Sequence, residues 1–320
     1  VWGPNDNGPR SARILDLDAL IPEEDQRKFA EVYVSAFLDT VVKDATHYLP
    51  IFRDHRRAAD WLPHTMYFNQ FEESSFRAVA DFEEDVDVTS GSMEGVTLLG
   101  DSLATWREAD LKLRSSNRAN TSASQMNQVL WFGLNRNIQG RSGEMGQPGR
   151  YSIELSSALN WKLALTPDHS LDLLLAPTED KPSPRKPAEG DSASAPNNSG
   201  GSDTASDSDD EEPEPLDLTV EVEDVFGARA SVPLSDYGVL RYPLKTEVLR
   251  RKDRESARFA NPWEVVMQSF SIPLSDFVAA NSSLNVNRLR SLHLVFDRSP
   301  VGTVAVDNIG FSKLNPAYFH

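Results

Sequence analysis

The sequence predicts a mainly β protein, a β-sandwich preceded by a short helical segment. Residues 270–311 hold three short apolar runs, each closed by Gly, Pro, Ser or Asp. Apolar and polar residues alternate there, as in Leu292 to Phe296, and a period of two is typical of strands. Residues 22–43 instead repeat apolar residues every three or four positions, which predicts a helix.

The helical segment covers residues 1–60. Pro22 followed by three acidic residues is typical of a helix start, because acids complement the positive end of the helix. One apolar stripe follows: Phe29, Val32, Tyr33, Ala36, Phe37, Thr40 and Val41. A shorter helical piece is predicted through 48–52. We expect the stripe to cover the sandwich or to complete a domain upstream of Val1.

Strands are predicted from Trp61 onward, about ten in all, which is in the range of a jelly roll. The runs before the C-terminal stretch are 65–71, 88–100, 105–113, 129–132, 151–155, 171–175, 216–222, 228–234 and 265–272. The string PLSDY at 233–237 is echoed by PLSDF at 273–277. Because Pro cannot extend a ladder and Ser and Asp favour turns, both strings predict strand exits.

An acidic insertion interrupts the predicted sandwich at 178–215. This stretch is low in complexity, and between 181 and 214 nine acids face three bases, a net charge of −6. Too few apolar side chains are present to offset the entropy of ordering, so the insertion is predicted to be disordered. Long loops are tolerated because closure cost grows only logarithmically. We therefore expect one sandwich, formed by 61–177 and 216–315.

Composition excludes several classes of function. The net charge of −17 and the scattered basic residues exclude general nucleic-acid binding. No apolar run approaches the ~18 residues of a membrane span. The absence of cysteine excludes disulfides and cysteine nucleophiles. The first residues lack a signal peptide's apolar core and an initiator Met, which is typical of an internal fragment or a processed product. The compartment stays open, and an extracellular one is compatible with the sequence.

A GDSL string at 100–103 suggests a GDSL-type esterase with Ser102 as nucleophile. Such a hydroxyl needs a base within reach and a group that orients the base. The D-x-x-H string of this chain, at 44–47, precedes Ser102, and His293 lies in a predicted strand. No GxSxG elbow or HExxH motif occurs. We therefore predict no catalytic residue, and whether the protein belongs to an enzyme is left open.

Two resemblances follow from these segments. The order IPLSDF, LHLVF and GTVAVDNIGF resembles the last three strands of galactose-binding-like jelly rolls. Together with the helix IPEEDQRKFAEVYVSAFLDTVV, the run YLPIFRDHRRAADWLP and DFEEDVDVTSG, the arrangement resembles the C-terminal region of a bacterial α/β-hydrolase-type protein with such a domain. The resemblance implies that 1–60 is the C-terminal end of an upstream serine-hydrolase domain, which would be the partner of the sandwich.

The resemblance also implies ligands. Jelly rolls of this type often hold a structural calcium ion through oxygen ligands, and the matching positions are Asp81, Glu83 and Asp307. No other cofactor is expected. Sugar-binding modules stack aromatic rings on sugars, and Trp106 and Trp161 have the polar neighbours of such a platform.

Three functions are predicted in order. The first is an accessory, non-catalytic β-sandwich region of an esterase- or lipase-like serine hydrolase. The second is a stand-alone carbohydrate-binding module, and the third is a GDSL-type esterase that uses Ser102.

Overall fold

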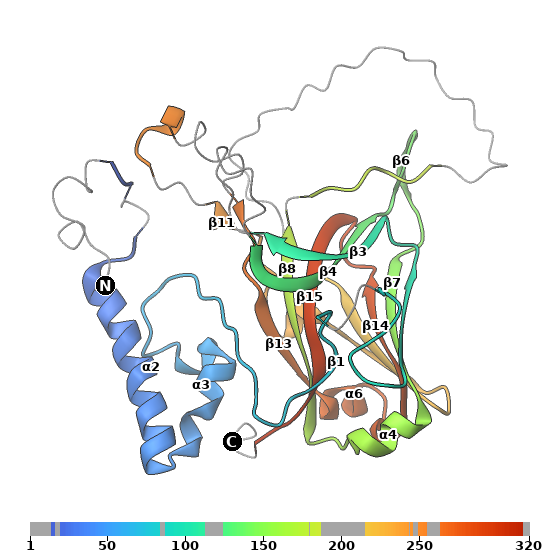
Figure 1. Ribbon diagram of the computed structural model, residues 1–320, viewed down its shortest axis with the longest axis horizontal. Helices are drawn as coiled ribbons and strands as arrows, with labels where there is room; N and C mark the ends of the chain where they lie inside the picture. Colours follow the sequence, from blue (N-terminus) through green and yellow to red (C-terminus); the bar gives the residue numbers. More distant parts are fainter. Residues whose placement is uncertain are drawn as a thin grey trace.

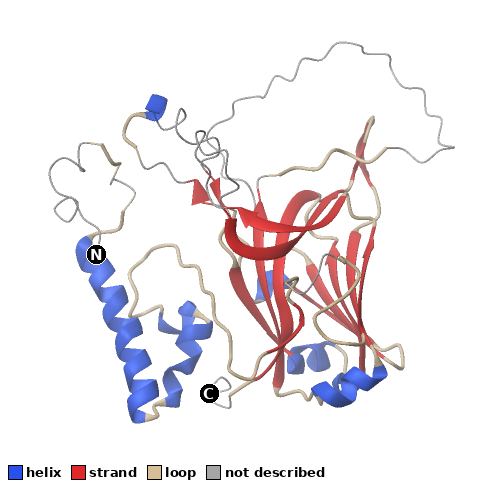
Figure 2. Ribbon diagram, in the orientation of Figure 1, coloured by secondary structure: helices blue, strands red, loops and turns tan. Residues whose placement is uncertain are grey.

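The computed structural model shows two antiparallel sheets packed face to face, with a helical segment at one side (Figures 1 and 2). It describes residues 14–16, 20–83, 87–112, 124–178, 180–186, 215–242, 244–245, 249–254 and 263–315. The predicted class, a mainly β sandwich preceded by a short helical segment, is confirmed. No described helix has the length and hydropathy that crossing a membrane requires.

The first sheet has the order β13-β8-β15-β4-β3, and β1 also pairs with β15. Its strands are β1 (Arg77–Ala80), β3 (Thr105–Lys112), β4 (Ser124–Asn135), β8 (His169–Thr178), β13 (Gln268–Pro273) and β15 (Val301–Lys313). The second sheet has the order β10-β9-β14-β7-β2. Its strands are β2 (Val96–Asp101), β7 (Gly149–Leu155), β9 (Thr219–Asp224), β10 (Arg229–Pro233) and β14 (Leu289–Phe296). Two small hairpins, β5 (Asn137–Ile138) with β6 (Arg141–Met145) and β11 (Leu244–Lys245) with β12 (Trp263–Glu264), complete the strands of the described residues.

The three C-terminal apolar runs form β13, β14 and β15, as predicted. Strands that precede the acidic insertion and strands that follow it are neighbours in both sheets. Of the insertion, residues 180–186 are described, and Arg185 pairs there with Asn137 and Gln139 through backbone hydrogen bonds. The predicted disorder falls mostly on 187–214, which lies outside the described residues.

The core lies between the sheets and is held by large side chains from both. Phe132 of β4 meets Phe296 of β14 edge to face at 4.7 Å and stacks on Tyr151 of β7 at 5.8 Å. Each of these side chains is almost completely buried. Because Phe132 faces the core, its neighbour Trp131 faces the opposite side of the first sheet, where it joins a smaller apolar cluster with Val129.

One predicted strand is wrong. Residues 65–71 form a loop that runs beside β13, and their backbone meets that strand only at Ser269. The backbone carbonyl of Asn69 accepts a hydrogen bond from the Ser269 N–H at 2.8 Å. The Phe71 N–H donates to the Ser269 hydroxyl at 2.8 Å. A single point of pairing is too short to make a ladder.

The helical segment consists of α2 (Glu23–Lys43), the 3₁₀ turn η1 (Thr46–Tyr48), α3 (Leu49–Arg53) and the 3₁₀ turn η2 (His55–Ala58). The predicted start after Pro22 is confirmed. Val32, Tyr33 and Ala36 of the stripe pack against α3 and η2 rather than against the sandwich, in a separate cluster with Ile51 and Ala58. Val41, which was predicted to belong to the stripe, is 64% exposed. Figure 1 shows α3 between α2 and the sandwich.

Both PLSD strings leave a strand at their proline. After Pro233, the last residue of β10, the chain turns into the 3₁₀ turn η3 (Leu234–Asp236). After Pro273, the last residue of β13, it forms the helix α6 (Leu274–Ala280). A further short helix, α4 (Ser157–Leu163), lies with α6 at one end of the sandwich (Figure 1).

Candidate functional site

The helical segment and the edge of the first sheet enclose a cavity of about 420 Å³, which we call the sheet–helix groove. Residues 53–57 of α3 and η2 form one wall, and 236–241 form the other. The floor is the edge strand β13, through 268–271. A smaller cavity of about 200 Å³ adjoins it and shares Arg53 and 269–271 with it.

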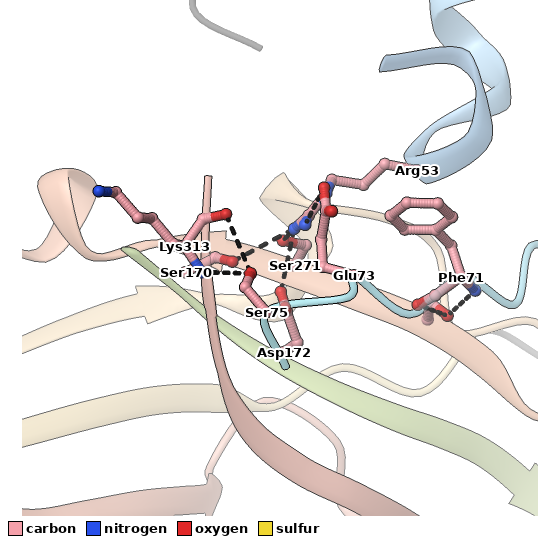
Figure 3. A network of polar contacts seen from close by, with 9 residues as sticks. Arg53, Phe71, Glu73, Ser75, Ser170, Asp172, Ser271 and Lys313 are labelled. Carbon is pink, nitrogen blue, oxygen red and sulfur yellow. Dashed lines mark hydrogen bonds and ion pairs between the residues drawn. The ribbon is translucent and has the colours of Figure 1, made fainter. Parts of the chain in front are cut away.

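Arg53 connects the helical segment to the outer face of the first sheet (Figure 3). Its guanidinium donates to the Ser170 hydroxyl at 3.2 Å, to the Asp172 carboxylate at 3.1 Å and to the Ser271 hydroxyl. Asp172 of β8 is paired with Ser271 of β13 in the sheet. Both side chains point away from the sandwich because their neighbours Leu171, Leu173, Phe270 and Ile272 fill its core.

The loop before β1 closes the Arg53 network from above. Glu73 lies 3.2 Å from the guanidinium, and the Phe71 ring lies beneath it at 5.6 Å. The side chains of Arg53, Glu73 and Asp172 are only 11%, 15% and 16% exposed. An arginine held by two carboxylates at this depth fixes the wall of the groove to its floor.

The two PLSD strand exits meet in the groove. Asp236 and Tyr237 follow β10, Ser275 and Asp276 follow β13, and all four line the cavity. The Tyr237 hydroxyl donates to the Asp276 carboxylate at 2.9 Å. Burial, and then the bond to Asp276, raise the pKa of Tyr237, so its hydroxyl remains a donor across the physiological range.

The wall from the helical segment is rich in arginine. Arg56 pairs with Asp54 at 2.9 Å and donates to the Tyr237 carbonyl at 2.8 Å. Arg57 and Arg241 also line the cavity, and neither makes an ion pair with a described residue. Each guanidinium carries five N–H donors and can therefore donate to a ligand in the groove.

Two side-chain rings line the groove together with these arginines. The ring of Tyr67 packs against His55 at 5.1 Å, and both line the groove. Burial lowers the pKa of His55, and the nearby Arg241 lowers it as well, although Asp54 opposes them. His55 is therefore neutral at pH 7, with one ring nitrogen able to accept a hydrogen bond.

The two predicted tryptophans lie away from the groove and away from each other. Trp161, on α4, is 79% exposed. Trp106, on β3, is half-buried against the core, where its ring meets Tyr151 edge to face at 6.4 Å. Only Trp161 has the exposure that a stacking platform requires.

The three predicted calcium ligands lie near one another. Burial, and to a smaller extent the nearby Glu83 and Asp81, raise the pKa of Asp307 to about 6, although hydrogen bonds from Asn127 and Asn308 oppose the rise. The oxygens of Asp307 accept from the Asn127 amide at 2.9 Å and the Asn308 N–H at 2.7 Å. The described residues contain no group of three His, Asp or Glu side chains arranged to hold a metal ion. As arranged, the three carboxylates accept hydrogen bonds from N–H donors, and the calcium site stays a prediction.

Ser102 lies at the turn between β2 and β3. Its hydroxyl donates to the adjacent Asp101 carboxylate at 3.3 Å. No described histidine is hydrogen-bonded to it. His293 is buried on the outer face of the second sheet, 2.8 Å from the Ser152 hydroxyl and 2.9 Å from that of Ser291. Among the described residues, Ser102 thus has no histidine base.

The groove itself was not predicted from the sequence. Its signals were present, however, in the charged run 53–57 and in the two PLSD strings. Each was interpreted alone, as a helix end or a strand exit.

No protein-family model matches the chain, and no curated protein matches it. Among solved structures, a family 30 carbohydrate-binding module aligns with 69% of this chain and 78% of its own at 10% identity and a TM-score of 0.33. The family 11 module of a cellulosomal cellulase of Clostridium thermocellum aligns with 76% of this chain and 98% of its own at 8% identity and a TM-score of 0.33. A module specific for non-crystalline cellulose aligns with 78% and 99% at 12% identity and a TM-score of 0.34. Similarity of this extent says nothing about the ligand of this chain.

Proposed function

We propose that this protein is a carbohydrate-binding module and that the sheet–helix groove holds the sugar. The observation that carries the proposal is a preformed cavity of about 420 Å³ whose polar groups converge from four segments of the chain. A volume of this size is in the range of small-ligand sites.

The groove offers what a sugar needs. Each sugar hydroxyl both donates and accepts, so a sugar site requires donors and acceptors side by side. Arg57 and Arg241 supply donors, and Asp236 and Asp276 supply carboxylate acceptors. The Tyr67 ring, which packs against His55 and Phe29, adds apolar surface to the wall of the groove, where the C–H groups of a sugar can make contact.

The predicted accessory role beside a hydrolase domain is a finer proposal. The described sheets are antiparallel, and no nucleophile elbow occurs in the sequence. Under this proposal the chain supplies binding and another domain supplies the reaction. An encoded GxSxG motif ahead of the present sequence would support it.

Titration calorimetry of the purified chain with a panel of soluble polysaccharides and oligosaccharides tests the binding function. We expect at least one to bind, and Arg57→Ala and Tyr67→Ala to weaken it at least about tenfold, as the loss of a charged hydrogen bond or an aromatic contact does. Trp161→Ala is the control, and it should leave binding unchanged. Absence of binding to the whole panel would contradict the function. Loss in Trp161→Ala with intact groove variants would move the site to α4.

A further inference from the structure

Helix α2 is apolar on two sides. Phe29, Tyr33 and Ala36 face α3 and its neighbours, where Phe29 and Tyr33 contact each other at 4.7 Å and Ala36 is buried. At 3.6 residues per turn, a second set lies on the opposite side. This set, which we call the outer face of α2, consists of Val34, Leu38, Val41 and Val42.

The outer face is open to solvent. Val34, Leu38, Val41 and Val42 are 56%, 49%, 64% and 73% exposed. Phe37, at the border of the two sides, is 55% exposed although its ring meets Phe52 edge to face. A helix that is apolar on both sides is normally covered on both. Figure 1 shows α2 as the outermost helix, with its neighbours α3 and the sandwich on one side only.

We propose that the outer face of α2 binds the same face of a second copy, as an antiparallel pair of helices about a two-fold axis. The apolar residues recur at spacings of three and four, which is the seam pattern of paired helices. A pair centred near Leu38 places Val34 of one copy opposite Val42 of the other. The seam is self-complementary, as a two-fold interface requires.

The charges on the same side favour the antiparallel orientation. Arg27 and Glu31 continue the outer face toward the start of α2. In a parallel pair, Arg27 of one copy would lie beside Arg27 of the other, and Glu31 beside Glu31, and like charges at such positions repel. In the antiparallel pair the two copies of Glu31 lie toward opposite ends of the seam, as do the two copies of Arg27, so like charges do not meet.

The exposed area sets the strength of the pair. The outer face and Phe37 together present on the order of 400 Å² of apolar surface in each copy, which is the size of the largest apolar patch on a typical monomer, and such patches are often functional. Two copies would bury on the order of 800 Å² from these side chains, at the low end of specific interfaces, so we expect a dissociation constant in the micromolar range.

Sedimentation velocity from about 1 µM to about 200 µM tests the pair. The wild type should shift from monomer to dimer and no further. Val41→Glu should stay monomeric throughout, whereas Lys43→Glu, an exposed position about 160° around the same helix from Val41, should dimerise as the wild type does. Because the chain has no cysteine, Leu38→Cys should give a disulfide-linked dimer on mild oxidation, and Lys43→Cys, on the other side of the helix, should not. A monomeric wild type at the highest concentration, open-ended oligomers, or a dimer that Val41→Glu leaves intact would overturn the proposal. Vesicle binding by a monomeric wild type would also overturn it and would assign the face to a membrane.

Discussion

Two buried groups on opposite sheets should give this protein opposing pH dependences. Burial lowers the pKa of His293 to about 4, and burial raises that of Asp307 to about 6. His293 lies on the outer face of the second sheet and Asp307 on the outer face of the first. With the sheets between them, their effects on the free energy of unfolding should add independently.

The signs follow from proton linkage. The unfolded chain protonates His293 below pH 6.5, while the folded chain resists until about pH 4, so stability rises with pH between these values. Folded Asp307 keeps its proton up to about pH 6, while the unfolded chain releases it near 3.8, so stability falls as pH rises through that window. At 1.36 kcal/mol per pKa unit, each group changes the free energy of unfolding by about 3 kcal/mol across its pH window. In the wild type the two changes have opposite signs and nearly cancel.

Removing one group should expose the other. In Asp307→Asn, the free energy of unfolding relative to wild type should increase by about 3 kcal/mol between pH 4 and pH 6.5. His293→Gln should show the opposite slope relative to wild type. Urea denaturation in half-unit pH steps measures both, with the exposed Asp110→Asn as the control. Profiles parallel to wild type for both variants would refute the reasoning.

Three further predictions concern stability. Arg53→Met should lower the free energy of unfolding, measured by urea denaturation, by about 3 kcal/mol, because it leaves two largely buried carboxylates without their partner. Arg57→Met, at an exposed position, should change the free energy of unfolding by less than about 0.5 kcal/mol. Phe132→Ala should cost about 3–5 kcal/mol, since it removes the ring that joins the two sheets; a smaller loss would mean that the core closes over the cavity. If the calcium site predicted from the resemblance exists, the protein should melt at a temperature several degrees higher in CaCl₂ than in EDTA. Asp307→Asn should abolish this difference. Equal melting temperatures of the wild type in the two buffers would exclude the calcium site.

The sandwich was predictable because its strands carry local signals. In β15 the apolar alternation and the turn residues before it fix the element without knowledge of the rest of the chain. Residues 65–71 carry a similar signal yet form a loop, because the edge of β13 offers them only Ser269 as a partner. Whether a β-like run becomes a strand depends on the neighbour that it finds.

The groove was less predictable because its parts are distant in sequence. Arg53, Tyr67, Tyr237 and Ser271 come from four segments, and each has an ordinary local explanation as a helix end, a loop or a strand exit. The outer face of α2 was missed for a related reason. The stripe around Ala36 was recognised, but which apolar residues stay exposed depends on where α3 packs.

The Arg53 network ties the proposed function to the fold. One wall of the groove belongs to the helical segment and the floor to β13, so the cavity exists only while the two are docked. Among the described residues, the hydrogen bonds of Arg53 to the sheet, of Arg56 to the Tyr237 carbonyl and of Asn69 to the Phe52 carbonyl connect them. A ligand in the groove would contact both sides and would stabilise the docked state in proportion to its concentration and affinity. Arg53→Met should therefore weaken binding through the loss of docking, and saturating ligand should recover part of the lost stability, whereas Arg57→Ala should weaken binding with the docked state intact.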